Sequence, residues 1–341
     1  MRTVLIDQPG SVYVGTVPDP VLSGPDGAIV QITTAAICGS DLHFYEGDYP
    51  LIEPVSLGHE AVGTVIEVGP QVRTVKVGDS VLISSVAGCG HCAGCDTRDP
   101  VTCLSGPQVF GAGALAGAQS EFLAVPGADF QLLKVPDGID TEAALLLTDN
   151  LATGWAAAQR AEIPPGATVV VMGLGAVGLC ALRSAIAQGA GTVFAVDPVA
   201  GRRERAEASG ATAISPEQIG LVHEATGGRG AASVIDAVGN DTTMNAALTC
   251  VRAGGTVSVV GVHDLNPFPF PATLSLIRSI TLRMTTAPVQ RTWPELVPLI
   301  QAGRIDTGGI FTHAMSLADA AQGYAAVAAR TADCVKVTLV P

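Results

Sequence analysis

Four of the chain's eight cysteines lie within fifteen residues, in the run CGHCAGCDTRDPVTC that begins at Cys89. Two, two and seven residues separate Cys89, Cys92, Cys95 and Cys103. Four thiolates brought together by tight turns form a closed tetrahedral zinc site, which is structural because no coordination position stays open. An iron–sulfur cluster is the alternative, but its spacing of two, two and three residues followed by proline is absent. The spacing therefore predicts a structural zinc.

A second group of potential metal ligands lies nearer the N-terminus. The segment Cys38-Gly39-Ser40-Asp41-Leu42-His43 is followed by Gly58-His59-Glu60. A cysteine, a histidine and an acid, each beside a glycine, can bind a metal that keeps an open position for substrate. His59 can equally be a satisfied core histidine, and Cys38 a small buried hydrophobe. Spacing alone favours neither interpretation.

A glycine-rich run, Gly173-Leu174-Gly175-Ala176-Val177-Gly178, follows the apolar segment TVVVM and precedes a helical pattern. In this context the glycines allow a tight turn and a close backbone approach, so that a pyrophosphate can lie on the helix N-terminus. The next apolar segment, TVFAVD, ends in Asp197, whose carboxylate can accept hydrogen bonds from a ribose diol. Arg202 is either a second contact to that ribose or a solvated charge. Together these features predict dinucleotide binding.

The elements that must position these residues differ along the chain. Residues 28–37, 61–69 and 80–85 are short β-branched runs separated by turn residues, which predicts a β-rich region. From about residue 141 the spacing is helical, and strands then alternate with helices, which predicts a parallel, doubly wound sheet. Residues 100–120 are uncharged and suit a loop near a site. The end of the chain, CVKVTLV, is expected to be a strand that returns to the first domain.

Composition limits the classes of partner. The 341 residues suffice for two domains, and 48% apolar with 14% charged residues excludes disorder. The formal charge of −13 argues against nucleic acid, since phosphate binding needs a basic face. Residues 163–182 are uncharged, but two prolines and four glycines indicate turns instead of a membrane span. The N-terminus has no signal pattern, so a cytoplasmic location is expected.

Taken together, these motifs resemble those of the zinc-dependent medium-chain alcohol dehydrogenase family, which includes sorbitol, threonine and glutathione-dependent formaldehyde dehydrogenases. The resemblance runs nearly end to end. It rests on CGSDLH at 38–43, GHEAVGTV at 58–65, VGD at 77–79, the four-cysteine segment, TDNLATG at 148–154, GLGAVG at 173–178 and Asp197.

The resemblance implies an α/β fold in which a Rossmann doubly wound parallel sheet is inserted into a GroES-like β-rich catalytic domain. The expected boundaries are residues 1–149 for the catalytic domain, with the structural-zinc lobe at about 88–104. Residues 150–287 are expected to form the NAD-binding domain, and residues 288–341 to return to the catalytic domain.

The same resemblance implies a role for each motif residue. At a catalytic zinc, Cys38 and His59 are ligand positions, and Asp41 orients the histidine from outside the ligand set. Ser40 and His43 occupy the positions that relay the substrate proton. Thr153 and Val177 occupy positions that pack on the nicotinamide. The remaining expected cofactor contacts are Gly173, Gly175, Ala176, Gly178, Asp197 and Arg202.

One position departs from the family's usual site of two cysteines and a histidine. Asp149 stands where the second cysteine is found. Several bacterial relatives carry aspartate there, so Asp149 is expected to be the third ligand. Glu60 is then a neighbouring carboxylate that can take the fourth position when water or substrate leaves.

The implied reaction is the reversible oxidation of a primary or secondary alcohol to an aldehyde or ketone, with hydride transfer to NAD and two zinc ions per chain. Asp197 favours NAD over NADP, and Arg202 and Arg203 are expected to be available to a 2′-phosphate if that acid is removed. A dehydrogenase for a polyol, threonine or a thiol–formaldehyde adduct is the alternative. A non-catalytic crystallin-like or quinone-reductase-like relative would lack the zinc ligands. A homotetramer, or a homodimer, without nucleic-acid or membrane partners is expected.

Overall fold

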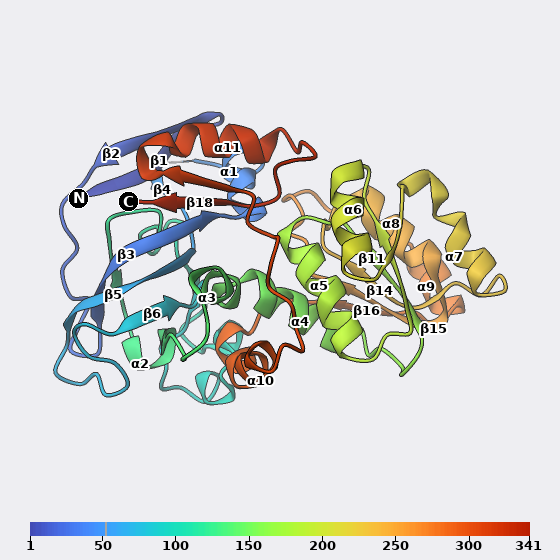
Figure 1. Ribbon diagram of the computed structural model, residues 1–341, viewed down its shortest axis with the longest axis horizontal. Coiled ribbons are helices and arrows are strands. Elements are labelled where there is room, and N and C mark those ends of the chain that lie inside the picture. The colour runs from blue at the N-terminus through green and yellow to red at the C-terminus, as the bar shows by residue number, and fades with distance from the viewer. Residues whose placement is uncertain (52) are drawn as a thin grey trace. The chain divides into compact units, whose positions relative to one another are not determined.

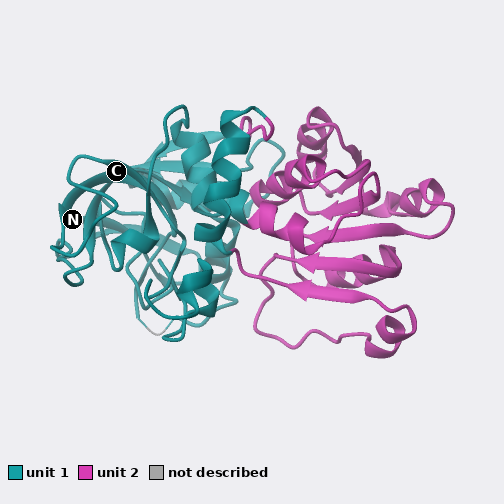
Figure 2. Ribbon diagram, turned by 90° about the horizontal axis from the view of Figure 1, so that it is seen from below, with its two compact units in different colours: residues 1–152, 288–303, 311–341 teal, residues 153–287, 304–310 magenta. Residues whose placement is uncertain are grey.

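The computed structural model describes residues 1–51 and 53–341, which form two compact units. Unit 1 comprises residues 1–152, 288–303 and 311–341, and unit 2 comprises residues 153–287 and 304–310; Figure 2 shows them in teal and magenta. The division differs from the expected boundaries, because residues 150–152 belong to unit 1 and residues 304–310 to unit 2. The second segment is held within unit 2 by Arg183 and Arg205, which donate to the carbonyl oxygens of Asp306 and Gly309 (3.0 and 3.1 Å).

Unit 1 is built mainly of β-strands. Its largest sheet has the strand order β10-β6-β5-β3-β18-β17, and β9 also pairs with β3. A second sheet has the order β2-β1-β4, and β7 pairs with β8. The strands are β1 (Arg2–Gln8), β2 (Ser11–Thr16), β3 (Ala28–Ile37), β4 (Val55–Ser56), β5 (Glu60–Val68), β6 (Ser80–Ile83), β7 (Val86–Ala87), β8 (Gln108–Val109), β9 (Phe122–Val125), β10 (Leu132–Lys134), β17 (His313–Ser316) and β18 (Val337–Val340).

The helices of unit 1 are short, apart from one. They are η1 (Gly39–Asp41), α1 (Leu42–Glu46), η2 (Cys95–Thr97), η3 (Pro100–Thr102), α2 (Ala128–Gln131), α3 (Thr141–Thr148), α10 (Val289–Gln301), η5 (Leu317–Asp319) and α11 (Ala320–Ala328). Helix α3 begins where the Asp140 side chain accepts a hydrogen bond from the Ala143 N–H (2.8 Å). Its residues 143–148 are all buried, so it lies within the core and not on the surface.

The end of the chain returns to unit 1, as CVKVTLV predicts. Strand β18 pairs antiparallel with β3, with Val337 opposite Ile37. Figure 1 shows the two strands side by side, one in red and one in blue. Their buried residues join the α11 side chains in one apolar core that includes Ile37, Tyr324 and Val337.

Unit 2 contains the predicted parallel sheet. Its strand order is β13-β12-β11-β14-β15-β16, and each neighbouring pair is parallel. The strands are β11 (Thr168–Met172), β12 (Thr192–Val196), β13 (Thr212–Ile214), β14 (Ala231–Asp236), β15 (Val251–Val259) and β16 (Thr281–Met284). The central strands are buried over nearly their full length, as is typical of parallel sheets with covered faces.

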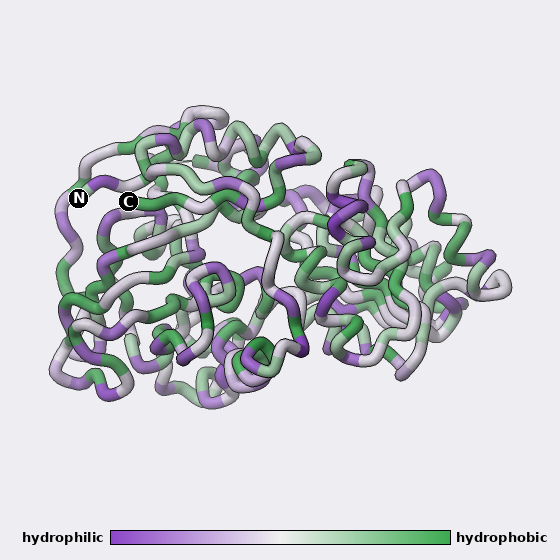
Figure 3. Tube along the Cα trace, viewed as in Figure 1, coloured by the Kyte–Doolittle hydropathy of each residue, from purple (hydrophilic) through white to green (hydrophobic). Residues whose placement is uncertain are grey.

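Helices alternate with these strands. They are α5 (Ala176–Ala187), α6 (Ala200–Ala208), η4 (Pro216–Gln218), α7 (Gly220–Ala225), α8 (Asp241–Cys250) and α9 (Ala272–Ile277). Helix α4 (Asn150–Arg160) contains the boundary between the two units. Figure 3 shows α6, which carries the RRER sequence, as a hydrophilic stretch. No helix within residues 1–51 and 53–341 combines the length and the apolar character that a bilayer crossing requires.

Candidate metal centres and dinucleotide loop

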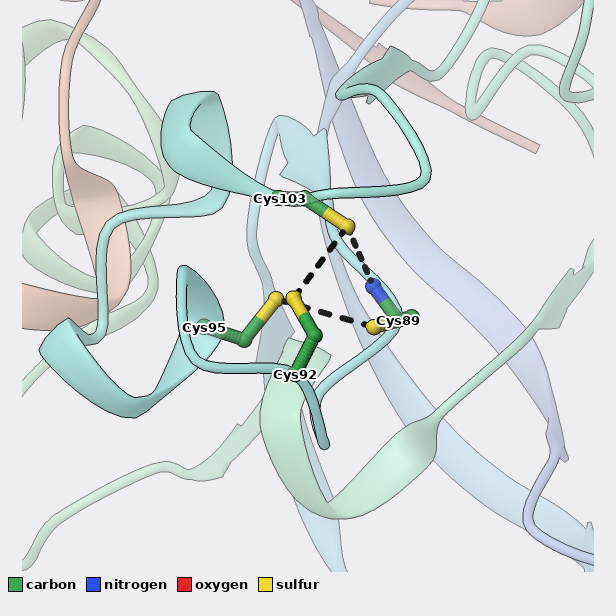
Figure 4. A group of neighbouring side chains, drawn as sticks. All are labelled: Cys89, Cys92, Cys95 and Cys103. Atoms are coloured by element: carbon green, nitrogen blue, oxygen red, sulfur yellow. Dashed lines mark hydrogen bonds between the residues drawn. The ribbon is translucent and has the colours of Figure 1, made fainter.

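The four cysteines of residues 89–103 converge on one point, as Figure 4 shows. The Cys89 and Cys95 sulfur atoms are 4.0 Å apart, as are those of Cys92 and Cys103. A disulfide requires about 2.05 Å, so all four thiols are free. Zinc–sulfur distances of about 2.3 Å in a tetrahedron place the sulfur atoms roughly 3.8 Å apart. The arrangement therefore fits one cation at its centre.

Tight turns produce this convergence. Helices η2 and η3 reverse the chain between Cys95 and Cys103, and the Asp99 side chain starts η3 by accepting from the Val101 N–H (3.2 Å). Gly94 is needed for the close approach, because a Cβ there would lie 1.8 Å from the Thr102 carbonyl oxygen. The local turns thus bring the four ligand atoms together.

Backbone amides of the lobe donate to the sulfur atoms. The N–H groups of Cys89 and Leu104 lie 3.3 Å from the sulfur atoms of Cys103 and Cys92. The Leu104 donor lowers the pKa of Cys92 to about 6, whereas burial raises the pKa of Cys95 to about 12. One thiol thus ionises readily while its neighbour resists. A divalent cation is the group that permits all four to ionise together.

The second ligand set is assembled by strand register. Ala36 pairs with Glu60 in the antiparallel β3–β5 ladder, so Cys38, just after β3, lies beside His59, just before β5. Helix α3 ends at Asp149, which leaves helical geometry (φ −156°, ψ −69°). One ligand atom from each of Cys38, His59, Glu60 and Asp149 lies within 4.8 Å of all the others.

Distances within this set also fit a metal. The Asp149 Oδ2 lies 3.8 Å from the Cys38 sulfur and 3.7 Å from the His59 Nε2. The latter distance is too long for a good hydrogen bond. Zinc–ligand distances of about 2.0–2.3 Å in a tetrahedron place the ligand atoms roughly 3.3–3.8 Å apart. The three side chains therefore surround a point that a zinc ion would fill.

Asp41 takes the orienting place that the resemblance implies. Its Oδ1 lies 3.2 Å from the His59 Nδ1. Its Oδ2 accepts from the Cys38 N–H (2.9 Å) and from the Gln119 Nε2 (3.2 Å). A carboxylate on Nδ1 keeps Nε2 free to bind a metal. Asp41 thus fixes both the backbone at Cys38 and the ring of His59.

Glu60 is completely buried and forms an ion pair with Lys336, which precedes β18. The Lys336 Nζ lies 2.5 Å from Glu60 Oε1, and the Asn150 Nδ2 donates to the same oxygen (3.0 Å) and to Asp149 Oδ2 (3.1 Å). Among the described residues, Glu60 Oε2 has no hydrogen-bond partner. That oxygen is the ligand atom which Glu60 can offer to a cation.

Burial and neighbouring charges shift the pKa values of the ligands His59 and Asp149 in opposite directions. Burial lowers the pKa of His59, but the Asp41 carboxylate and then Cys38 raise it, and the net pKa is well above the usual value. Burial raises the pKa of Asp149, but the interaction with the nearby His59 ring outweighs burial and lowers that pKa. Metals bind the neutral ring, so a cation at this site competes with the proton that these charges favour.

The predicted proton-relay residues lie apart. The Ser40 hydroxyl donates to the Cys38 sulfur (3.3 Å), so it lies at the ligand set. The His43 Nδ1 lies 2.8 Å from Asp48 Oδ2, and its ring stacks on Tyr49. In the described part of the chain, no hydrogen bond joins Ser40 to His43. The direct link between these two residues therefore remains a prediction.

The glycine-rich run in unit 2 has the form that a pyrophosphate requires. Gly173 has a φ of +82°. A Cβ at Gly178 would lie 1.7 Å from the Gly173 carbonyl oxygen, so α5 can approach the loop only with glycine there. A Cβ at Gly175 would meet nothing within 4 Å. Gly175 also begins α5 without a side-chain cap, which leaves the first N–H groups of the helix for an anion.

Asp197 follows β12 and binds the backbone on both sides. Its Oδ2 accepts from the Leu174 N–H and its Oδ1 from the Val199 N–H, both at 2.8 Å. The Arg202 guanidinium lies 3.9 Å from Asp197 Oδ2. Arg203 instead donates to the carbonyl oxygens of Asp197 and Pro198 (2.7 and 2.9 Å). The availability of both arginines to a phosphate once Asp197 is replaced stays a prediction.

The other predicted cofactor contacts also belong to unit 2. Ala176 and Val177 form the first turn of α5, directly after Gly175. Thr153 lies on α4 and is 8% exposed. Their contacts with a cofactor stay a prediction.

Comparison with known proteins decides the family. The sequence profile of the alcohol dehydrogenase GroES-like domain matches residues 24–137, and that of the zinc-binding dehydrogenase domain matches residues 176–302. A probable zinc-binding alcohol dehydrogenase of Mycobacterium tuberculosis is 66% identical over 341 residues, which are 100% of this chain and 89% of that protein. The chain belongs to the zinc-binding alcohol dehydrogenase family.

Solved structures of related dehydrogenases share the fold. An alcohol dehydrogenase from Thermus sp. ATN1 has a TM-score of 0.92 and 35% identity, covering 100% of this chain and 99% of that one. A short chain alcohol dehydrogenase of Escherichia coli CFT073 complexed with NADH has a TM-score of 0.88 and 25% identity, covering 100% of this chain and 99% of that one. A putative zinc-binding dehydrogenase of Sinorhizobium meliloti bound to NADP has a TM-score of 0.82 and 27% identity, covering 100% of this chain and 99% of that one.

Sequence reasoning missed four residues around the dehydrogenase's second set of potential metal ligands: Lys336, Asn150, Gln119 and Tyr324. A signal existed for two of them. Lys336 is the lone charge in the apolar segment CVKVTLV, and a lysine inside a buried strand requires a partner. Asn150 directly follows the predicted ligand Asp149. Nothing local in the sequence marks Gln119 or Tyr324.

The buried ion pair leads to a stability prediction. Lys336→Met leaves the Glu60 carboxylate buried without its cation, and we expect a loss of about 3–5 kcal/mol in the free energy of unfolding. Adding Glu60→Gln removes the uncompensated charge, so the double variant recovers much of that loss. Urea unfolding measures both.

The matched control for this test is Arg330→Met, which breaks the exposed Arg330–Glu46 pair (2.7 Å). It should cost about 0–1 kcal/mol. Equal effects of Lys336→Met and Arg330→Met, or a double variant no more stable than Lys336→Met, would contradict the assignment of a buried ion pair.

Proposed function

We propose that this protein oxidises a primary or secondary alcohol to an aldehyde or ketone, reversibly, with hydride transfer to NAD. One observation carries the proposal beyond family membership. The ligand atoms of Cys38, His59 and Asp149 converge around a point of tetrahedral zinc dimensions, and the unpaired Glu60 Oε2 belongs to the same set. A set of three side chains with a further group nearby is typical of a catalytic zinc that exchanges a ligand.

In this proposal each chain binds two zinc ions, each with its own set of ligands. Cys89, Cys92, Cys95 and Cys103 hold a structural ion, because four thiolates close its coordination. Cys38, His59 and Asp149 hold the catalytic ion, which when bound acts as a Lewis acid on the substrate oxygen. One thiolate and one carboxylate balance its two positive charges, while Lys336 balances Glu60.

The chain's own residues handle the proton. Ser40 lies at the ligand set and is the first acceptor for the alcohol proton. His43, whose side chain is 18% exposed, passes the proton to solvent. Because the two residues share no hydrogen bond here, a water molecule or a ligand hydroxyl completes the path. Asp48, whose Oδ2 lies 2.8 Å from the His43 Nδ1, holds the ring in place.

Asp197 supports NAD as the cofactor. Its carboxylate already receives two backbone N–H bonds, and its remaining lone pairs can accept from a ribose diol. A 2′-phosphate at that position would face a like charge. Relatives of this fold bind NADH or NADP, so the local acid is what supports the choice between them.

The reaction is tested by initial rates of NAD reduction with primary alcohols, secondary alcohols, polyols, threonine and formaldehyde–thiol mixtures. We expect simple alcohols to be the best substrates, and Cys38→Ser to abolish turnover and remove one of two zinc ions while the fold persists. Cys92→Ser should instead remove the other zinc and lower the unfolding temperature. Absence of turnover with every class would contradict the proposal. A higher kcat/KM for a polyol, threonine or the thiol–formaldehyde adduct than for simple alcohols would show that the substrate belongs to that class instead.

The cofactor choice has its own test. Two like charges 4 Å apart at an effective dielectric of 20 cost about 4 kcal/mol, so we expect at least about 100-fold higher kcat/KM with NAD than with NADP. Asp197→Gly should reduce this ratio, with Arg202 and Arg203 available to the phosphate. Asp197→Asn is the control that keeps the shape and removes the charge. Equal kcat/KM for both cofactors in the unchanged enzyme would contradict this role of Asp197.

A second copy of the chain is the expected partner, in a homotetramer or a homodimer. In unit 2, β16 has a neighbour only on its β15 side among the described strands. Helix α9, which precedes it, exposes Leu276 and Ile277 by 79% and 75%. An edge strand beside exposed apolar side chains is a surface that oligomers cover.

Sedimentation tests the oligomer. The unchanged chain of 34.4 kDa should sediment as a tetramer or dimer, and Leu276→Glu with Ile277→Glu should shift it to smaller species. Val21→Glu, at an equally exposed residue of unit 1, is the control and should change nothing. A monomer of the unchanged protein at micromolar concentration would contradict the expectation.

A further inference from the structure

We propose that Tyr324 and Gln119 are positioning residues for the metal centre, acting through Asp41 on the ring of His59. The inference rests on the proposed function, because it concerns how tightly the Cys38–His59–Asp149 set holds its cation.

The four side chains form a continuous hydrogen-bonded path. The Tyr324 hydroxyl donates to Gln119 Oε1 (2.9 Å), and the Gln119 Nε2 donates to Asp41 Oδ2 (3.2 Å). Asp41 Oδ1 then lies 3.2 Å from the His59 Nδ1. All four side chains are buried, and 205 residues separate Tyr324 from Gln119 along the chain. The path thus links helix α11 to the metal centre.

The direction of each hydrogen bond along this path fixes the direction of the next. A phenol that donates to Oε1 turns the Gln119 amide so that its Nε2 faces the Asp41 carboxylate; the reversed amide would place its oxygen against that carboxylate. Burial raises the pKa of Tyr324 well above its usual value, so the phenol keeps the proton it donates. With Oδ2 occupied by Gln119 and the Cys38 N–H, Asp41 offers Oδ1 to His59.

The backbone is shaped to admit Gln119. Gly58, the residue before His59, has a φ of +95°, and a Cβ there would lie 2.3 Å from the Gln119 Cγ. The Gln119 amide also donates to the Ala36 carbonyl oxygen (3.1 Å), which anchors it to the end of β3. Two apolar side chains could fill this volume without the cost of burying polar groups. A polar path in that place therefore points to a role beyond packing.

Tyr324→Phe removes the hydroxyl and keeps the ring. Removing a group that orients a metal ligand from outside the ligand set costs about 10–100-fold in metal affinity. Tyr324 is two hydrogen bonds further from the metal, so we expect a loss of about tenfold. Gln119→Leu removes the contact to Asp41 itself and should cost more. Tyr45→Phe is the matched control, because the Tyr45 ring lies 5.9 Å from that of Tyr324 but outside the path.

The measurement is a Co²⁺ titration of the metal-free protein, followed by absorbance. A site with four thiolates and a site with one thiolate differ strongly in sulfur-to-cobalt charge-transfer intensity, so both affinities come from one experiment. The four-cysteine site is the internal reference. The proposal expects weaker Co²⁺ binding at the one-thiolate site in Tyr324→Phe and Gln119→Leu, and unchanged binding at the reference site. Tyr45→Phe should change neither site.

A double variant sharpens the result. If Tyr324 acts through Gln119, Tyr324→Phe should have no further effect in the Gln119→Leu background. Additive losses, equal losses at both sites or unchanged affinity in Tyr324→Phe would each overturn the proposal. If the unchanged protein binds Co²⁺ only at the four-cysteine site, the proposed function itself fails. The two failures are therefore distinguishable.

Discussion

Cys38, Asp149, Glu60 and Asp41 can place up to four negative charges in one buried cluster, and such charges coexist only where positive charge lies among them. Lys336 supplies one such charge from the last segment of the chain. A divalent cation at the centre of the set would supply the rest. The need to balance these charges explains why the ends of β3 and α3, the start of β5 and the segment before β18 must meet at one place.

The two metal sites are formed in different ways. The four-cysteine site is local, since two 3-10 turns and a glycine bring all its ligands together within fifteen residues. The other set depends on tertiary structure, because the β3–β5 register and the end of α3 deliver its ligands. Substitution of a ligand in the four-cysteine site should therefore destabilise the lobe, whereas substitution of a ligand in the other set should reduce turnover. The rigid sheet of unit 1 is what gives the second set its geometry.

The sequence predicted the sites formed by neighbouring residues better than those formed by tertiary structure. The cysteine spacing and the glycine-rich run between strand and helix identify their sites because the relevant residues are neighbours in the chain. Cys38 and His59 were ambiguous by spacing, and only the family resemblance indicated them and Asp149. Lys336 and Glu60 are 276 residues apart, and Tyr324 and Gln119 are 205 residues apart. No periodicity connects such pairs, so their contacts emerge only from the pairing of β18 with β3 and the packing of α11. The engagement of Arg203 with carbonyl oxygens was likewise not visible in the RRER sequence.

The central claim is that the buried set of Cys38, His59 and Asp149 holds a zinc ion of its own. Anomalous diffraction from crystals of the unchelated protein, recorded above and below the zinc absorption edge, tests it most directly. We expect two peaks per chain, one within the four-cysteine lobe and one within about 2.0–2.3 Å of the Cys38 sulfur, a His59 ring nitrogen and an Asp149 oxygen. A single peak in the lobe, with the His59 ring still between Asp41 and Asp149, would contradict the account.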